Sequence, residues 1–458
     1  MATEYISLSV GCREKLEVPY NATWVSDNHS VVVKGQGWIY ATKDERYPNA
    51  VATITATEIK GIRTQEFEVT IVSWSANRIK MENIERYTKN YNITEIDGYY
   101  YVSIRDTGLE LYRTNDLSKL TGGITTLEKV GNLPDAQSIT TMLKTPHGYF
   151  IHCDTKIYRS TDLITWTLSV ELTPAMYAMR HCFDYYYDSD TNTTYVYTTE
   201  YNPDITVRHK AYRGTITDVG ETWEVILDLM SRIELEANPT TLYGGFHFHG
   251  VITDKVRNVT YILIGDFNNE ARILYSKDNC ETLHTLGWGS QQWRALSLWF
   301  TDKYVYWSMD TDALQRIFRI PHEWVGTKTP TEINHEKEIV ATLENGSFWY
   351  YIWAKDNLGD DVVLLSMAAE GNERDFNCRV FMIKEHHDLS VTVEEVNSTP
   401  QRPDTFNNFL QLEPFVQDKD GYIYMSGRGT DWATTWKFKL KRYGKNNLYK
   451  FVAPSRFL

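Results

Sequence analysis

The chain has 458 residues, 42% of them hydrophobic, and a formal net charge of −13, which suits a globular protein with room for more than one domain. The negative charge argues against nucleic acid or an anionic membrane as the partner. No apolar run approaches the roughly 18 residues that a membrane-spanning helix needs, and the N-terminal residues do not resemble a signal peptide. The five cysteines are scattered, so we expect free thiols of a protein made in a reducing cytosol.

Residues 1–74 are predicted to form a β-sandwich, because short runs alternate between apolar and polar residues. These runs are residues 6–10, 31–33, 38–40, 50–56 and 64–72. The segment resembles the bacterial Ig-like domain of the Big2 type, with the matching residues in the runs 23–33, 37–41, 52–56 and 67–72. The resemblance implies a spacer or a docking module. Residues 75–95 are polar and charged, and we expect a linker.

From residue 96 to residue 458 one pattern recurs seven times: an apolar strand, a tight polar turn, an aromatic-rich strand, and a strand that reads apolar–aromatic–basic. The third strand is the easiest to align, and its aromatic positions lie 43 to 63 residues apart. Its seven copies begin at Leu111, Ile157, Ala211, Leu274, Ile317, Val380 and Trp436. A repeat of this length is typical of the four-stranded blades of a β-propeller. The sequence therefore predicts an all-β protein with an N-terminal Ig-like sandwich and a seven-bladed propeller, with six blades as the alternative.

Several repeats carry an acidic turn after the third strand. The copies are residues 160–166, 218–223 and 276–283, with a weaker one at 114–117. They resemble the Asp boxes of sialidase-like propellers, in which the carboxylate accepts hydrogen bonds from turn N–H groups. We therefore expect Asp162, Asp218 and Asp278 to stabilise the fold. The run Phe318-Arg319-Ile320-Pro321 resembles a sialidase substrate-binding motif, but the third-strand repeat alone accounts for Phe318-Arg319, so we expect the likeness to be a coincidence.

No catalytic constellation emerges from the sequence. Glu200, Asp266 and Asp310 are carboxylates that propeller loops could bring together for glycoside hydrolysis. His247 and His249 could bind a metal ion from one strand face, but we expect an ordinary histidine pair where a blade begins. The sequence thus predicts no catalytic residue, no metal and no cofactor.

The ligand face of a propeller is built from loops that lead into the inner strands and loops that join the second and third strands. Here those loops are long and rich in aromatic residues, arginine and carboxylates, the side chains that stack on sugar rings and bind hydroxyl groups. The predicted glycan-binding residues are Tyr177, Arg180, Tyr243, His247, Asp266, Trp288, Trp293, Arg294, Asp310, Arg428 and Trp432.

The pairing of a Big2-like sandwich with a glycosidase-type propeller resembles the receptor-binding proteins of tailed bacteriophages, above all those of large myoviruses that infect staphylococci. The resemblance implies a virion protein of the tail tip or baseplate that attaches to host cell-wall glycan, such as teichoic acid or its sugars, without catalysis. It also implies docking to other tail proteins through the N-terminal domain and a homo-oligomer, with a trimer favoured. It implies no nucleic-acid partner and no insertion into a membrane.

Two alternatives stay open. The chain could be a glycoside hydrolase or sialidase-like depolymerase of the cell surface, in which case loop carboxylates would carry the chemistry. It could also be a cytosolic scaffold that binds other proteins through the propeller face.

Overall fold

The computed structural model divides the chain into two compact units, residues 1–80 and 81–458. The structure describes residues 4–9, 13–15, 22–27, 31–34, 38–41, 51–59, 64–72, 85–86, 91–104, 110–133, 139–153, 155–173, 181–202, 204, 206–237, 247–311, 315–343, 347–356, 359–368, 378–399, 411–428 and 435–439. Within these ranges no helix is both long and apolar enough to cross a membrane.

The first unit contains two sheets. One has the strand order β1-β7-β6-β3 and the other the order β2-β5-β4. The strands are β1 (Glu4–Ser9), β2 (Arg13–Lys15), β3 (Ala22–Ser26), β4 (Val31–Lys34), β5 (Trp38–Ala41), β6 (Val51–Glu58) and β7 (Thr64–Val72). Along β6 the buried residues Ala52, Ile54 and Ala56 alternate with less buried ones, as in a strand with one face toward a core. Two sheets are what a sandwich requires, and the Ig-like assignment stays a prediction.

The second unit is a β-propeller, which confirms the predicted all-β class. Its described residues form seven four-stranded antiparallel sheets, equal in number to the predicted repeats. The first four are β9–β12 (Tyr91–Ile96, Tyr99–Ile104, Glu110–Thr114, Glu128–Asn132), β13–β16 (Ile139–Thr145, Gly148–Cys153, Lys156–Ser160, Thr167–Glu171), β17–β20 (Phe183–Asp188, Thr193–Thr199, His209–Thr217, Gly220–Leu229) and β21–β24 (Phe248–Asp254, Val259–Ile264, Arg272–Ser276, His284–Trp288).

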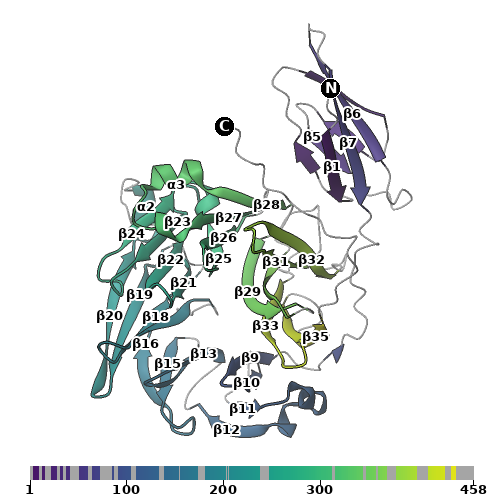
Figure 1. Cartoon of the computed structure of the whole chain (residues 1–458). Helices are drawn as coiled ribbons and strands as arrows, with labels where there is room; N and C mark the ends of the chain where they lie inside the picture. Colours follow the sequence, from purple (N-terminus) through teal and green to yellow (C-terminus); the bar gives the residue numbers. More distant parts are fainter. Residues whose placement is uncertain are drawn as a thin grey trace. The chain divides into compact units, whose positions relative to one another are not determined.

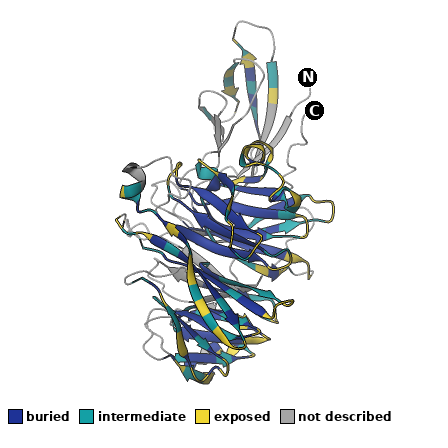
Figure 2. Cartoon of the chain, turned by 90° about the vertical axis from the view of Figure 1, so that its left-hand side faces the viewer, coloured by how far each residue is buried: buried dark blue, intermediate teal, exposed yellow. Residues whose placement is uncertain are grey.

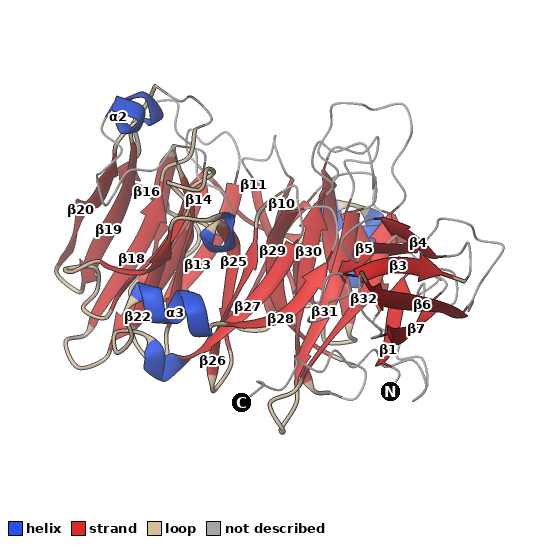
Figure 3. Ribbon diagram, turned by 90° about the horizontal axis from the view of Figure 1, so that it is seen from above, coloured by secondary structure: helices blue, strands red, loops and turns tan. Residues whose placement is uncertain are grey.

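The other three sheets are β25–β28 (Ala295–Phe300, Tyr304–Met309, Gln315–Pro321, Glu338–Leu343), β29–β32 (Ser347–Lys355, Asp361–Ala368, Cys378–Glu385, Val391–Thr399) and β33-β34-β35-β8 (Gln411–Gln417, Tyr422–Arg428, Thr435–Lys439, Glu85–Arg86). The first strands contact one another in the closed cycle β9, β13, β17, β21, β25, β29, β33, so the sheets follow each other around a ring (Figure 1). The short helices α2 (Arg232–Ala237) and α3 (Pro330–Glu336) belong to connections between strands (Figure 3).

The predicted linker is wrong for its second half. Strand β8 lies within residues 75–95, yet it pairs with β35 and supplies the outer strand of the last sheet. Strand β9 begins at Tyr91 and is the inner strand of the first sheet. A segment that precedes the first blade therefore completes the last one. This pairing joins the N-terminal and C-terminal parts of the unit. It adds a fourth strand to the three that the C-terminal part supplies.

Each of the seven repeated motifs lies in the third strand of its sheet, as predicted. In the first three sheets a β-bulge falls between the apolar and the aromatic residue, as at Ile157/Tyr158. In the fourth sheet the bulge falls between Ile273 and Leu274. The fourth copy therefore begins at Ile273, one residue earlier than the sequence alignment indicates, and Tyr275 takes the place of the basic residue.

Two of the predicted Asp boxes have the expected geometry. The Asp162 carboxylate accepts hydrogen bonds from the N–H groups of Ile164 and Thr165 at 2.9 and 2.7 Å, and the Asp278 carboxylate accepts one from Thr282 N–H at 2.9 Å. Asp218 does not belong with them. It lies in the tight turn that joins β19 to β20, where its carboxylate accepts a hydrogen bond from the Asn192 side chain at 2.8 Å.

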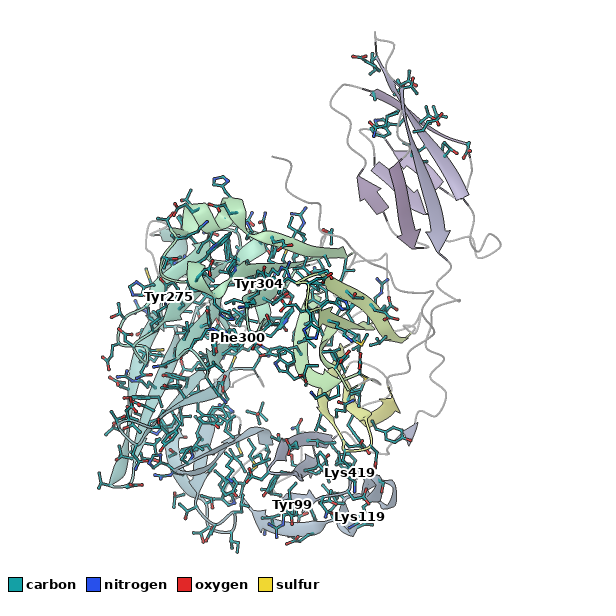
Figure 4. The ribbon with its side chains drawn as sticks, in the orientation of Figure 1. Tyr99, Lys119, Tyr275, Phe300, Tyr304 and Lys419 are labelled. Carbon is teal, nitrogen blue, oxygen red and sulfur yellow. The ribbon has the colours of Figure 1, made fainter. Side chains whose placement is uncertain are left out.

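In some sheets the basic residue of the third strand also contacts the next sheet, as Arg213 and Arg319 do. Arg319 is 6% exposed and donates hydrogen bonds to the Glu338 carboxylate at 2.7 and 3.0 Å and to Leu389 O of the next sheet at 2.8 Å. Its guanidinium lies 4.2 Å from the ring centre of Tyr304, which is labelled in Figure 4. These contacts explain Phe318-Arg319-Ile320-Pro321 as a structural strand, as the repeat predicts.

Replacing Arg319 by methionine is expected to lower the free energy of unfolding by about 2–3 kcal/mol, because buried hydrogen bonds to a charged group are lost. The matched control is Arg113→Met at the same position of the first sheet. Arg113 is more exposed and pairs with Glu128 of its own sheet, so we expect a loss below about 1 kcal/mol. Urea unfolding of both variants checks the difference, and equal losses would contradict the inter-sheet role.

The core fills the space between adjacent sheets (Figure 2). The strands β21, β22, β23, β25, β26 and β27 are buried along most of their length, whereas the outer strand β24 is not. His152, on β14, lies in this interior with no exposed surface, and its ring meets that of Phe183 at 5.6 Å. Burial lowers the pKa of His152 to about 3 from an ordinary value of 6.5.

Acid is therefore expected to destabilise the propeller through His152. The unfolded chain takes up a proton near pH 6.5 that the folded protein does not take up until about pH 3, so stability present above pH 6.5 is lost as the pH falls through this window. Between pH 7 and 4.5 the wild type should lose roughly 2–3 kcal/mol more than His152→Leu. Urea unfolding of both proteins at the two pH values measures this. Equal losses of unfolding free energy in the wild type and in His152→Leu would contradict the lowered pKa of His152.

Candidate ligand site at the mouth of the propeller

One end of the propeller gathers the residues that the sequence predicts for ligand binding. We call this end the mouth: there the chain enters β21 and β25, and there β18, β22 and β26 end. Because neighbouring strands are antiparallel, the start of a first strand and the end of the second lie at the same edge of each sheet. His247 precedes β21, Asp266 follows β22, Arg294 precedes β25 and Asp310 follows β26.

These residues meet in space and form, with His249, a charged group that we call the mouth cluster. The carboxylate of Asp266 lies 3.3 Å from His247 Nε2 and 3.2 Å from His249 Nε2. Arg294 bridges the two carboxylates, with Nη2 3.1 Å from Asp266 Oδ1 and Nε 3.1 Å from Asp310 Oδ2. Four residues predicted from separate loops therefore share one site, to which the structure adds His249.

Backbone features hold the cluster in place. His249 is the additional residue of a β-bulge, since Phe248 and Gly250 face adjacent residues of β22, and a bulge re-aims the side chain it carries. Gly265 has a φ of +128°, and a Cβ there would lie 2.4 Å from Ala271 Cα. Glycine is thus required directly before Asp266. The side chain of Gln291 donates a hydrogen bond to Asp266 O at 2.8 Å.

The cluster is charged although it is mostly buried. Burial by itself raises the pKa of the Asp266 carboxyl, but the hydrogen bonds from His247 and His249 outweigh it and bring that pKa well below its ordinary value of 3.8. Burial lowers the pKa of His247, although Asp266 acts in the opposite direction. At neutral pH the site therefore holds an ionised Asp266 beside a neutral His247 imidazole, which can still donate an N–H hydrogen bond.

Exposed aromatic side chains lie at the same end. Trp288, the last residue of β24, is 56% exposed, and Phe267, next to Asp266, is 42% exposed. The guanidinium of Arg232 lies 3.9 Å from the ring centre of Phe267, and the Tyr201 ring lies 4.6 Å from that of His247. The mouth thus combines aromatic faces with charged hydrogen-bonding groups.

Not all predicted site residues lie at this surface. Trp293 is completely buried and stacks on Trp307 with ring centres 5.1 Å apart, so its ring is part of the core and is not accessible to a ligand. Glu200 is also buried, and its carboxylate accepts hydrogen bonds from Thr173 N, Lys210 N and the Tyr212 hydroxyl, which makes it a structural group. Tyr177, Arg180, Tyr243 and Trp432 lie outside the described residues, and Arg428 lies on β34 with its side chain undescribed.

Four residues of the mouth are not among the predicted binding residues, namely His249, Phe267, Tyr201 and Arg232. The sequence places His249 on the same strand face as His247, but its contact with Asp266 lies next to a bulge that the sequence does not reveal. Phe267 follows the predicted Asp266 in the same loop, and its position in a loop between the second and third strands was the signal that could have identified it.

Comparison with known proteins adds a likeness of fold. No known family pattern and no curated protein matches the chain. Among solved structures it is similar to YCF48 bound to D1 peptide, with a TM-score of 0.45 and 10% identity over 79% of this chain and 96% of that one. An ancestral GH74 enzyme gives a TM-score of 0.46 and 10% identity, with 77% of this chain and 46% of that one covered. The WD40 domain of SCAP from fission yeast gives 0.39 and 9%, with 79% and 88% covered.

Proposed function

We propose that the propeller binds a carbohydrate at its mouth. The observation that carries this proposal is the mouth cluster, in which Arg294 lies 3.1 Å from both Asp266 and Asp310. The exposed rings of Phe267, which follows Asp266 in the chain, and of Trp288 lie at the same end of the propeller. Aromatic faces stack on the C–H groups of a sugar ring, and fixed carboxylate and guanidinium groups bind its hydroxyls.

Binding without hydrolysis suits this chemistry best. A glycosidase needs one carboxylic acid whose raised pKa keeps it protonated near neutral pH. The pKa of Asp266 is lowered instead, and Asp310 is 2% exposed with its carboxylate held by Arg294. Asp266 is therefore not arranged as a proton donor. The fixed charges of the cluster are suited to orienting a bound sugar rather than to hydrolysing it.

In this proposal the chain attaches a phage virion to its host. The support comes from the sequence, in which the Big2-like segment at residues 1–74 precedes the propeller, as in phage receptor-binding proteins. The first unit would then dock to the tail or baseplate and the mouth would bind cell-wall glycan. With a net charge of −13, and with Arg294 already paired with two carboxylates, binding to an anionic polymer such as teichoic acid would depend on its sugar substituents.

A pull-down on whole bacteria tests the proposal. Purified full-length protein is incubated with intact staphylococci and with the same cells stripped of wall glycans, and the bound fraction is measured. We expect retention on intact cells and loss on stripped cells, with no sugar released into the supernatant. Equal retention on both would contradict glycan binding. Sugar release that stops on Asp266→Asn or Asp310→Asn would show a hydrolase instead.

A further inference from the structure

Three side chains of the mouth cluster hold their ligand atoms at the spacing of a metal coordination shell. His247 Nε2 and His249 Nε2 are 3.0 Å apart. Each of these nitrogens lies near a different oxygen of Asp266, with Oδ2 3.3 Å from His247 Nε2 and Oδ1 3.2 Å from His249 Nε2, and one ligand atom from each of the three residues lies within 4.8 Å of the others. Donor atoms placed at tetrahedral angles about 2.0–2.1 Å from a zinc ion lie roughly 3.3 Å from one another. We propose that His247, His249 and Asp266 bind a divalent transition-metal ion, with zinc preferred.

The backbone positions the side chains of His247, His249 and Asp266. His247 and His249 flank Phe248 at the start of an inner strand, where residues two apart share a face, and their Nε2 atoms lie 3.0 Å apart next to the bulge. Asp266 is fixed by Gly265 and by the hydrogen bond from Gln291. Ligands on a rigid sheet edge lose little conformational freedom on binding, which favours affinity.

The surroundings complete the site. His249 Nδ1 lies 3.7 Å from Asp310 Oδ2, which is too far for a hydrogen bond. A small approach would let the carboxylate accept from this nitrogen, as carboxylates behind metal-binding imidazoles do. Asp310 is itself held by Arg294 Nε at 3.1 Å. Two carboxylates against one guanidinium leave one negative charge when both imidazoles are neutral, and this charge favours a cation.

The donor types select the class of ion. Calcium and magnesium take oxygen ligands, whereas imidazole nitrogen suits zinc and its neighbours in the first transition row. Three protein ligands leave a fourth position open for water or for an oxygen of a ligand. Among the three, the Asp266 side chain is the most exposed, at 18% against 6% for His247 and 2% for His249, so the open position lies on its side.

A metal titration tests the inference without any glycan, so its outcome is independent of the proposed function. The full-length protein is dialysed against a chelator and titrated with zinc chloride by calorimetry. We expect one tight equivalent per chain, an affinity at least about 100-fold lower in His249→Gln and in His247→Gln, and a 10- to 100-fold loss in Asp310→Asn. His335→Gln, which changes an exposed histidine of α3, is the matched control and should bind as the wild type does.

Cobalt provides a second readout that needs no variant. Cobalt chloride added to the dialysed wild type should give the intense visible absorption of a four-coordinate ion, which one equivalent of zinc removes and calcium does not. Zinc binding that is equal in the wild type and His249→Gln would overturn the inference. So would a cobalt spectrum like that of the hydrated ion.

Discussion

Replacing Arg294 by leucine is expected to lower the free energy of unfolding by about 3–5 kcal/mol, because it leaves the buried Asp310 carboxylate without its cation. The Asp310 side chain is 3% exposed and the Asp266 side chain 18%, and Arg294 lies 3.1 Å from both carboxylates. Chemical unfolding followed by circular dichroism measures the loss. We also expect the variant to lose glycan binding, because Arg294 is part of the mouth cluster.

The matched control is Arg208→Leu. Arg208 also faces two carboxylates, Glu234 at 2.8 Å and Asp228 at 3.8 Å, but its side chain is 49% exposed, so its loss should cost below about 1 kcal/mol. Adding Asp310→Asn to Arg294→Leu should recover part of the stability, since the unpaired buried charge is removed. Equal effects of the two arginine changes would contradict the claim that the mouth cluster is electrostatically coupled.

Replacing Trp307 by alanine is expected to destabilise the propeller by about 3–5 kcal/mol, as large-to-small changes of buried aromatic residues do. Trp307 has no exposed surface and stacks on Trp293 and Phe318, with ring centres 5.1 and 5.3 Å away. Its indole N–H donates a hydrogen bond to Gln292 O at 2.9 Å. The variant thus removes the packing between two neighbouring sheets.

Circular dichroism during urea unfolding gives the result, because fluorescence changes with the number of tryptophans. The control is Trp288→Ala, the same change at a residue that is 56% exposed, for which we expect a loss below about 0.5 kcal/mol. Similar losses in the two variants would show that the buried stack contributes little beyond an exposed ring.

Much of the fold could be predicted because the third strand repeats its residues. Its apolar, aromatic and basic positions each have a fixed environment in the sheet, as Arg213 and Arg319 show by donating to carboxylates of their own sheet and to backbone of the next. The two-residue strand β8 could not be predicted, since its strand character comes from pairing with the distant β35. The bulge that shifts the fourth repeat to Ile273 leaves no mark in composition either.

The sequence predicts which loops form the site, but it does not predict which of their side chains contact one another. The position of Asp266, Arg294 and Asp310 at strand ends placed them at one edge, whereas their pairing depends on loop geometry. Trp288 and Trp293 illustrate the limit: both stand in one predicted loop, yet the first is exposed and the second buried. The short 3₁₀ turn at Gln291–Trp293 turns Trp293 toward the core, and composition alone does not distinguish the two.

The most direct test of glycan binding at the mouth compares two exposed tryptophans. Trp288 ends β24 at the mouth, whereas Trp353, 46% exposed, lies near the end of β29 at the opposite edge. Binding of each alanine variant to intact bacterial cell walls is measured against the wild type. We expect Trp288→Ala to bind about tenfold more weakly, the loss of roughly 1.4 kcal/mol of stacking, and Trp353→Ala to bind unchanged. Equal binding by both variants, or a loss confined to Trp353→Ala, would contradict the location of the site.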